Sequence, residues 1–534
     1  MAENSQSARR LFLGCFIALV ATAFGFAVRG AVLSDWALQF GLSEEQKGIL
    51  NGVGLAPFAI SIILLSLVVD RIGYGWIMAV AFLGHFTSAL LTIFAPNYQT
   101  LYIATFIFGL ANGAVEAVIN PVVATIYRNN KTHWLNVLHA GWPGGLVLGG
   151  LLSIAVFKGG AQLGNSLPGH LWQWQMGLLL PPIIAYGLLL LGQNFPQQER
   201  VEAGVSYRSM LEEFGWGSAY IVSFLILMGV SQFVSIFAEP GSAPFLTPKA
   251  GLIWAIGPAV LFGVFIHSFG RPMFVFLLVV MMLLATTELG TDGWIQDIMG
   301  STLKDPVKGT MFLVYTSAIM FVLRFFAGPI VHRISPLGLL AVCAVLATVG
   351  LYWLGHAGQA IFMLIIAATV YAFGKTFFWP TTLGVVSEQY PKGGALLLNA
   401  ISGVGMIFAG TIGSPAIGTV QDRNLAAAVE QAMPEAYPSL TKTTKGQFFD
   451  FQTIDSAKLT SLPADQLEKF DAIQRETKQL ALADIAVLPA IMFVCYMVLI
   501  LYFKSRGGYQ AQVLTGHSAN DEKFTGGVAG AIEA

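Results

Sequence analysis

Charged residues are scarce in this chain: 11% of its 534 residues are Asp, Glu, Lys or Arg, against about 25% in an ordinary soluble domain. This shortage excludes a soluble globular fold. Cysteine is scarcer still, and Cys15, Cys343 and Cys495 each lie within an apolar run, which excludes a disulfide framework and a spaced set of metal ligands. The net charge of −1 comes with no basic patch bearing interleaved aromatics, so we expect no nucleic-acid partner.

Apolar runs are abundant, because 55% of the residues are hydrophobic. Each run has about 20 residues and is long enough to cross a hydrocarbon layer roughly 30 Å thick. They predict an all-α polytopic membrane protein with about fourteen transmembrane helices. The first run imitates a signal peptide, and we interpret it as a retained span. The predicted spans are 10–33, 48–69, 75–95, 101–127, 134–157, 173–193, 217–238, 251–269, 272–291, 310–332, 337–356, 360–387, 394–418 and 482–503.

The distribution of Lys and Arg predicts the orientation, since cytoplasmic loops carry an excess of these residues. With a cytoplasmic N-terminus, every cytoplasmic segment receives at least one cation, and the C-terminus is cytoplasmic as well. The polar segment 419–481 then falls outside the cell. Its last part is typical of an exposed helix that starts near Pro463 and leads into the final span. We interpret this segment as a lid or a stabilising cap.

An internal repeat relates the two ends of the chain. VVDRIG at 68–73 recurs as IVHRIS at 330–335, Pro121 recurs as Pro380, and Leu135-Asn136 recurs as Leu398-Asn399, all with a shift of about 260 positions. Repeated helix bundles with a site near the bilayer midplane are the architecture of secondary transporters. We therefore expect an N-terminal six-helix bundle at 1–193, a cytoplasmic linker with two extra spans at 194–270, and a C-terminal six-helix bundle at 271–534.

Several motifs resemble those of a known family. VVDRIGYG after the second span resembles the loop signature G-x-x-x-D-R-x-G-R-R of the major facilitator superfamily, although Ser66, Tyr74 and Gly75 depart from it. VEAVINPVV, LNVLHAGWPGG and TELGTDGWIQDIM resemble the fourth, fifth and seventh spans of its fucose/glucose/galactose–proton symporter branch. The resemblance implies a fold of two six-helix pseudo-repeats, here with two extra helices. It also implies that Glu116, in the E-x-x-x-N-P motif, couples transport to protons, and that His139 stands at a sugar-contact position that is Gln in the family.

A polar stripe supports the interpretation of Glu116. Asn112, Glu116 and Asn120 recur every four residues within an apolar run, so they share one helix face. An ionisable group in a span is costly and usually faces a cavity or a partner, and burial disfavours the charged form of a carboxyl. Glu116 is therefore either a carboxyl that gains and loses a proton, or one held permanently by hydrogen bonds or an ion pair.

Other polar and aromatic residues within the predicted spans are candidates for the substrate site, with packing, ion pairing and snorkelling as the alternative roles. Glu288 and Asp292, one turn apart, suit a sugar clamp or a sodium site, whereas an enzyme active site is not expected. Four residues near the cytoplasmic side are expected to form a gate. The substrate-site candidates are Arg29, Asn120, Asn136, His139, Trp142, Glu288, Asp292, Trp294, Lys375 and Trp379, and the gate candidates are Asp70, Arg71, Arg324 and Arg333.

These observations predict a secondary active transporter that imports a small polar solute, first a monosaccharide or sugar derivative, together with a proton. An organic-anion symporter, an exporter of amphipathic compounds and a non-transporting membrane receptor remain open alternatives. We expect no cofactor beyond the coupling proton, which sodium would replace in one alternative. The expected partners are the small-molecule substrate and the lipid bilayer, and we expect a monomer in the inner membrane of a bacterium.

Overall fold

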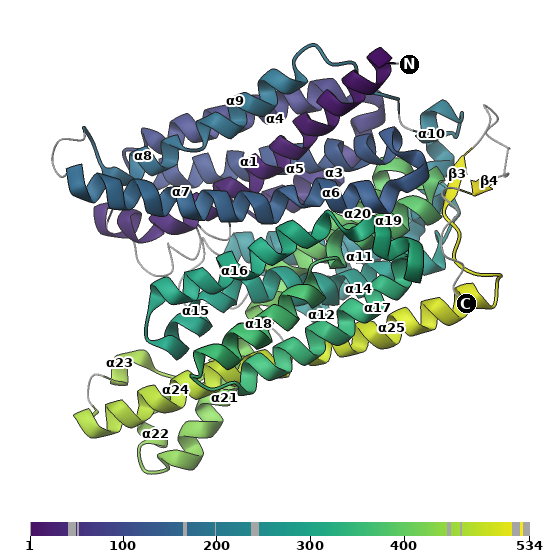
Figure 1. Cartoon of the computed structure of the whole chain (residues 1–534). Coiled ribbons are helices and arrows are strands. Elements are labelled where there is room, and N and C mark those ends of the chain that lie inside the picture. The colour runs from purple at the N-terminus through teal and green to yellow at the C-terminus, as the bar shows by residue number, and fades with distance from the viewer. Residues whose placement is uncertain are drawn as a thin grey trace.

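The computed structural model describes residues 2–40, 50, 53–163, 168–197, 199–235, 245–445, 450–459, 462–514 and 524–526. Helices make up almost all of this part of the chain, and most of them lie side by side along one common direction (Figure 1). The end of the bundle that carries α10 (Glu199–Glu202) and β3 (Gln512–Leu514) is the one that we predict to face the cytoplasm, and it is called the inner end below.

The first group of helices forms the upper layer in Figure 1, coloured purple to blue. In this group, α1 packs against α7 and α9, and α5 packs against α3 and α4. We call this group the N-half. Its helices are α1 Ala2–Phe40, α3 Ala56–Ile72, α4 Tyr74–Ile93, α5 Tyr98–Ile126, η1 Arg128–Asn130, α6 Lys131–His139, α7 Gly141–Leu163, α8 Leu171–Gly177 and α9 Leu180–Leu190.

The linker adds α10, α11 (Tyr207–Ser235), α12 (Pro248–Trp254) and α13 (Ile256–Ile266). Within α11 the backbone turns sharply at Gly215, where φ is +64°, a value that favours glycine. A side chain there would also collide with Gly270, because a Cβ at position 215 would lie within 2.3 Å of the Gly270 Cα. Of the two extra membrane helices, α11 packs beside the second half of the chain, where it contacts α14 and α20, and α12 and α13 pack against α11.

The remaining helices form the lower layer in Figure 1, the C-half. Here α17 packs against α18 and α25, and α15 packs against α16. Its membrane helices are α14 Pro272–Ala285, η3 Thr286–Gly290, α15 Thr291–Leu303, α16 Pro306–Arg324, α17 Ala327–His356, α18 Ile361–Lys375, α19 Phe378–Gln389, η4 Pro391–Gly393, α20 Gly394–Phe408, η5 Ala409–Gly413, α21 Ser414–Ala432 and α25 Val487–Lys504. After α25 the chain ends with β3 and β4 (Phe524–Gly526), which pair antiparallel.

The predicted number of spans agrees with the structure. Over the described residues, twelve helices are long and apolar enough to cross a membrane, and two shorter apolar helices, Ala56–Val69 and Met311–Arg324, lie at the second and tenth predicted spans. Each of the fourteen predicted spans overlaps one of these helices. At the thirteenth span the helix is longer than the predicted span, because α21 continues beyond 418 to Ala432. The sequence LAAAVEQA, which is rich in strong helix formers, explains the continuation.

The outer end carries a small extension that rises from α21. It contains α22 (Tyr437–Leu440), the antiparallel hairpin of β1 (Thr441–Lys445) and β2 (Asp450–Ile454), α23 (Ser456–Leu459) and α24 (Ala464–Ile485). Phe470 of α24 is buried in a separate apolar cluster with Val429 and Leu440. The predicted helix after Pro463 is confirmed as α24, which Pro463 caps.

The candidate transport site between the halves

Four helix breaks meet near the middle of the bundle. The helix α6 ends at His139, α16 ends at Arg324 and α18 ends at Lys375, while the π-helical turn η3 contains Glu288. A break leaves backbone carbonyls without their helical partners, and such backbone is tolerated at membrane depth only where other groups satisfy it. Turns of π-helix are also frequent at functional sites. These breaks therefore mark the candidate site.

The Arg324 side chain joins three of the four breaks. Its guanidinium donates to the Thr376 carbonyl oxygen at 2.8 Å, to the His139 carbonyl oxygen at 2.5 Å and to Glu288 Oε1 at 3.0 Å. The negative ends of helix dipoles favour a cation at these carbonyls. Because His139 belongs to the N-half, Arg324 also links the two halves. Arg324 and Glu288 form an ion pair in which both side chains are almost fully buried.

A second ion pair lies one helical turn away. Lys375 donates to Asp292 Oδ1, and the Lys375 side chain is completely buried while that of Asp292 is 15% exposed. The Lys375 ammonium also lies 5.2 Å from the centre of the Tyr371 ring. Glu288 and Asp292 come from one helical segment, so a single element supplies the carboxylates for two cations on two other helices.

The N-half contributes a chain of hydrogen bonds that contains no ion pair. Asn120 Nδ2 donates to Glu116 Oε2 at 2.6 Å, and Asn120 Oδ1 lies 2.8 Å from His139 Nε2. All three side chains are buried. Within the described part of the chain, no salt bridge includes Glu116. Through His139 this chain reaches Arg324, so contacts run continuously from Glu116 in the N-half to Glu288 in the C-half.

Most of the predicted substrate-site residues belong to this central group. Asn136 Nδ2 donates to Thr381 Oγ1 at 3.1 Å and so joins α6 to α19 across the halves. Trp379 is buried on the first turn of α19, just beyond the break at Lys375. Together with the residues described above, this group contains Glu116, Asn120, Asn136, His139, Glu288, Asp292, Lys375 and Trp379.

Three predicted substrate-site residues have other surroundings. Arg29 is buried within the N-half, where it donates to Ser88 and Thr105 and lies over the Phe108 ring. The Trp142 ring packs against Phe26 of α1, with 5.6 Å between the ring centres. Trp294 donates to the backbone and the hydroxyl of Ser414. No ion pair or hydrogen bond in the described residues connects these three side chains to the central charges.

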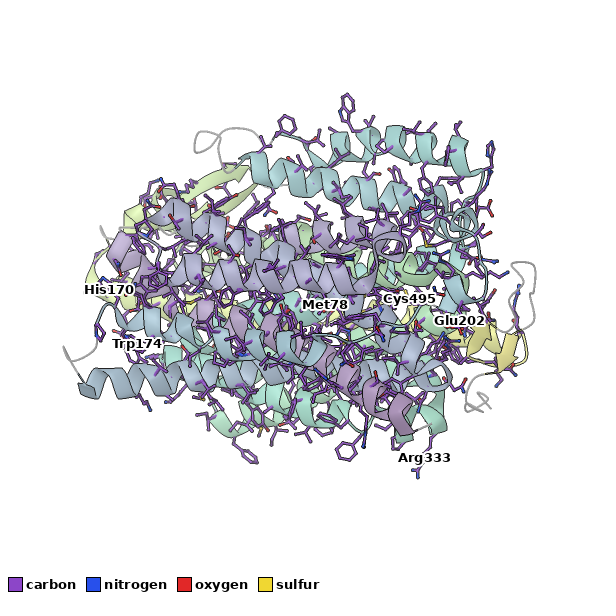
Figure 2. All side chains as sticks on the ribbon, turned by 90° about the horizontal axis from the view of Figure 1, so that it is seen from above. Met78, His170, Trp174, Glu202, Arg333 and Cys495 are labelled. Carbon is purple, nitrogen blue, oxygen red and sulfur yellow. The ribbon has the colours of Figure 1, made fainter. Side chains whose placement is uncertain are left out.

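The gate candidates Arg71, Arg324 and Arg333 have separate surroundings. We predicted Arg324 near the cytoplasmic side, and the structure pairs it with Glu288 in the central group. Arg71 is exposed and lies over the ring of Tyr207 in the linker, 4.2 Å from its centre, and Arg333 is exposed at the edge of the molecule (Figure 2). The side chain of Asp70 lies outside the described residues.

Contacts between the halves at the inner end involve residues that the sequence did not single out. Thr132 donates to Glu388 Oε1 from its backbone nitrogen and its hydroxyl, at 3.1 and 2.5 Å, and Lys131 donates to the Ser387 carbonyl at 3.2 Å. The helices α6 and α19 approach so closely that a Cβ at Gly384 would lie 2.8 Å from the Thr132 Cα. Residues 128–132 follow Pro121 of the N-P motif, and residues 387–389 follow its repeat, Pro380. The internal repeat could therefore have predicted that these two segments meet.

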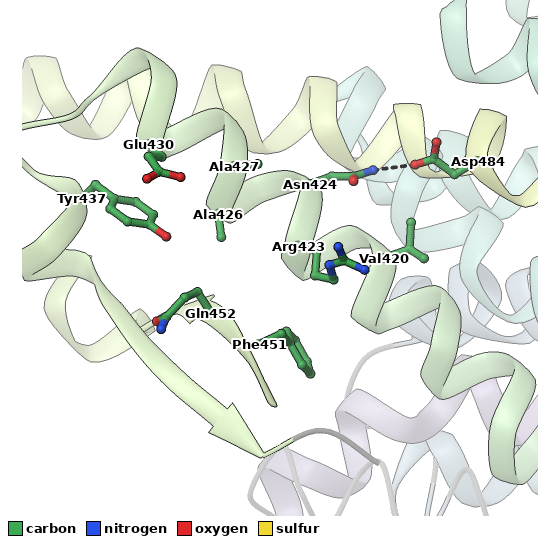
Figure 3. A pocket seen from close by; sticks show the side chains of 10 residues that line it. All are labelled: Val420, Arg423, Asn424, Ala426, Ala427, Glu430, Tyr437, Phe451, Gln452 and Asp484. Atoms are coloured by element: carbon green, nitrogen blue, oxygen red, sulfur yellow. Dashed lines mark hydrogen bonds between the residues drawn. The ribbon is translucent and has the colours of Figure 1, made fainter. Parts of the chain in front are cut away.

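A cavity of about 820 Å³ opens elsewhere, on the outer extension. It lies between α21, α22, β2 and α24, and Asn424 donates to Asp484 along its wall (Figure 3). Its lining includes none of the central charged residues. We therefore base the candidate transport site on the buried charges and helix breaks rather than on this cavity.

The fold and the buried charges define a class: a polytopic membrane transporter built from two helix bundles with its polar site between them. The chain belongs to the Major Facilitator Superfamily, whose model matches residues 15–295. The similarity to solved structures agrees with this assignment. The fucose:proton symporter FucP of E. coli superposes with a TM-score of 0.54 at 13% identity, over 90% of this chain and 98% of that one.

Two curated relatives are similar to part of the chain. The gentisate transporter of Corynebacterium glutamicum is 24% identical over 269 residues, which cover 48% of this chain and 58% of the relative. The gallate transporter of Pseudomonas putida is 26% identical over 140 residues, covering 26% of this chain and 31% of the relative. The chain thus matches less than two thirds of the length of either relative.

Proposed function

We propose that this transporter imports a small organic anion together with a proton. The observation that carries the proposal is the pair of buried cations, Arg324 and Lys375, at the centre of the C-half. Burying a charge is expensive unless it is paired, and a carboxylate substrate provides the same kind of partner that Asp292 provides now. The proposed substrate class differs from our first prediction from the sequence, which was a monosaccharide or sugar derivative.

The Lys375–Asp292 pair is the proposed carboxylate site. Asp292 is partly exposed while Lys375 is completely buried, so the carboxylate of Asp292 is the partner that an arriving anion can replace. Tyr371, on the same helix as Lys375, and Trp379, at the start of α19, add aromatic surface. Gentisate and gallate, named for the two curated relatives, are aromatic carboxylates that suit such surroundings.

Proton coupling is proposed to depend on Glu116. Its side chain accepts a hydrogen bond from the neutral amide of Asn120, and a buried carboxyl without a counter-charge favours its neutral, protonated form. Access from the outside would let Glu116 take up a proton, and access from the inside would let it release one. The electrochemical gradient would then drive import of the anion.

A monosaccharide is the second candidate. The observation that favours it is the set of uncharged polar side chains at the centre: Asn120 is hydrogen-bonded to His139, and Asn136 to Thr381 of α19. Amide and imidazole groups bind hydroxyls in pockets of this kind. The similarity in fold to the fucose symporter also supports it.

A thermal-shift panel tests the two candidates against each other. Gentisate, gallate and benzoate are compared with fucose, glucose and xylose on the purified full-length protein. We expect the acids to raise the melting temperature of the wild type and of Lys249→Met, an exposed-lysine control, but not of Lys375→Met. Stabilisation by a sugar and by none of the acids would overturn the organic-anion proposal.

A further inference from the structure

Two buried carboxylates, one from the C-half and one from the linker, accept hydrogen bonds from the N-half at the inner end. Glu388 of the C-half accepts both hydrogen bonds from Thr132 of the N-half through Oε1. Glu199 of the linker accepts from Lys131 through Oε2 at 2.7 Å. Lys131 in turn donates to the Ser387 carbonyl of the C-half. All four side chains of Lys131, Thr132, Glu199 and Glu388 are at most 6% exposed.

The remaining oxygen of each carboxylate binds the C-terminal segment. The Tyr509 hydroxyl donates to Glu388 Oε2 at 2.8 Å, and the Leu514 backbone nitrogen donates to Glu199 Oε1 at 2.8 Å. Between these contacts, the Gln389 side-chain amide donates to the Gln510 carbonyl at 2.8 Å. Residues 509–514, which we call the C-terminal strap, therefore connect Glu388 to Glu199.

Apolar packing fixes both ends of the strap. Tyr509 is buried against Phe503 of α25, with 5.2 Å between the ring centres. Leu514 is buried with Ala203 and Val205, which directly follow α10. The strap is thus anchored on the C-half at its start and on the linker at its end.

The geometry of these contacts depends on a closed inner end. Opening this end toward the cytoplasm separates α6 from α19, so Lys131 and Thr132 must leave Ser387 and Glu388. Because α10 packs against η4 of the C-half, Glu199 then loses Lys131 while Glu388 loses Thr132. In the closed arrangement the strap holds both carboxylates in the orientation in which they accept from Lys131 and Thr132, so its contacts favour that arrangement.

We propose that the C-terminal strap is part of the inner gate of this transporter, and that Tyr509 and Glu388 are positioning residues for its conformational step. The inference rests on membership of a transporter family and not on the identity of the substrate. A hydrogen bond to a charged group is stronger than one between neutral groups. Removing the Tyr509 hydroxyl is therefore expected to shift the closed-to-open ratio about tenfold toward open.

Distance measurements between spin labels test the proposal on the full-length protein. The labels are placed at Asn129→Cys and Lys504→Cys, two exposed positions on opposite halves at the inner end, in a Cys495→Ser background. We expect Tyr509→Phe and Glu199→Gln to increase the population with the longer distance about tenfold. The matched control Tyr502→Phe, which changes an exposed tyrosine on α25, is expected to keep the wild-type distribution.

The melting temperature distinguishes a gate from a purely structural contact. A gate predicts a changed distance distribution while the melting temperature of Tyr509→Phe stays near that of Tyr502→Phe. An unchanged distribution in both Tyr509→Phe and Glu199→Gln would overturn the proposal. A lower melting temperature without a change in the distribution would overturn it as well, because the strap would then only support the fold.

Discussion

The two halves of this transporter bury their ionisable groups in different ways. In the N-half, Glu116 is bonded to an amide, and Arg29 is bonded to the hydroxyls of Ser88 and Thr105. In the C-half, Glu288 and Asp292 are each paired with a cation. The halves are related by one repeated pattern in the sequence, yet among the described charges at the centre of the bundle only those of the second half form ion pairs.

This difference indicates how each half can respond to transport. A buried ion pair keeps its charges while both partners stay, and it loses much stability when one partner is removed. A buried carboxyl with neutral partners is neutralised by a proton instead. In the proposed transport cycle the N-half therefore binds the proton, and the C-half exchanges one anion for another.

The largest expected effect comes from breaking a pair in the C-half. Arg324→Met leaves Glu288 without its cation and frees the carbonyls of His139 and Thr376, so we expect a loss of about 3–5 kcal/mol in unfolding free energy. The measurement is reversible unfolding in mixed detergent micelles. The additional change Glu288→Gln is expected to recover part of the loss.

The matching change in the N-half is Arg29→Met, and we expect it to lower the unfolding free energy by about 1–2 kcal/mol. Ser88 also donates to the Ala104 carbonyl and Thr105 to the Leu101 carbonyl, so both hydroxyls keep a partner when the guanidinium is gone. Equal losses for Arg29→Met and Arg324→Met would remove the contrast between the halves.

Glu116→Gln tests the proposed role of the N-half in coupling. The amide keeps the size of the side chain and cannot bind or release a proton. We expect at least a tenfold fall in uptake driven by a pH gradient in liposomes, using whichever acid or sugar of the panel stabilises the protein, while exchange of that solute continues. Glu430→Gln, on an exposed side chain of α21, is the control. Concentrative uptake at the wild-type rate in Glu116→Gln would contradict the role.

The smallest expected effect concerns a contact between the halves. Asn399 Nδ2 donates to the Ala117 carbonyl at 2.9 Å, whereas its Oδ1 is buried without a hydrogen-bond partner. Asn399→Ala removes a favourable hydrogen bond and an unsatisfied oxygen together. We therefore expect the unfolding free energy to fall by no more than about 1 kcal/mol. Unfolding in mixed micelles measures it against Asn424→Ala at the outer end. A loss above about 3 kcal/mol would show that this contact matters more than its geometry implies.

Local spacing predicted part of the site. The stripe of Glu116 and Asn120 places both side chains on one helix face, and the structure joins them by a hydrogen bond. The helix after Pro463 was predicted from capping and periodicity and is present as α24. Both features depend on residues a few positions apart, which a sequence displays directly.

Partners that are distant in sequence were not predicted. The sequence did not indicate which acid pairs with Lys375, and the structure gives Asp292. We also did not predict from the sequence that Arg324 contacts three helix breaks. The same is true of the C-terminal strap that connects Glu388 to Glu199. Each of these contacts depends on how one helix is rotated and shifted along another, and an apolar run does not encode that register.

The sequence alone thus determined that the chain crosses the membrane many times, where its spans lie and which acids and bases they bury, because the price of moving each residue into lipid is a local property. Only the tertiary structure decided which charge meets which, since the energy of an ion pair depends on a few ångströms of separation between helices. The pairing of the central charges in the C-half, and its absence in the N-half, emerged at that level.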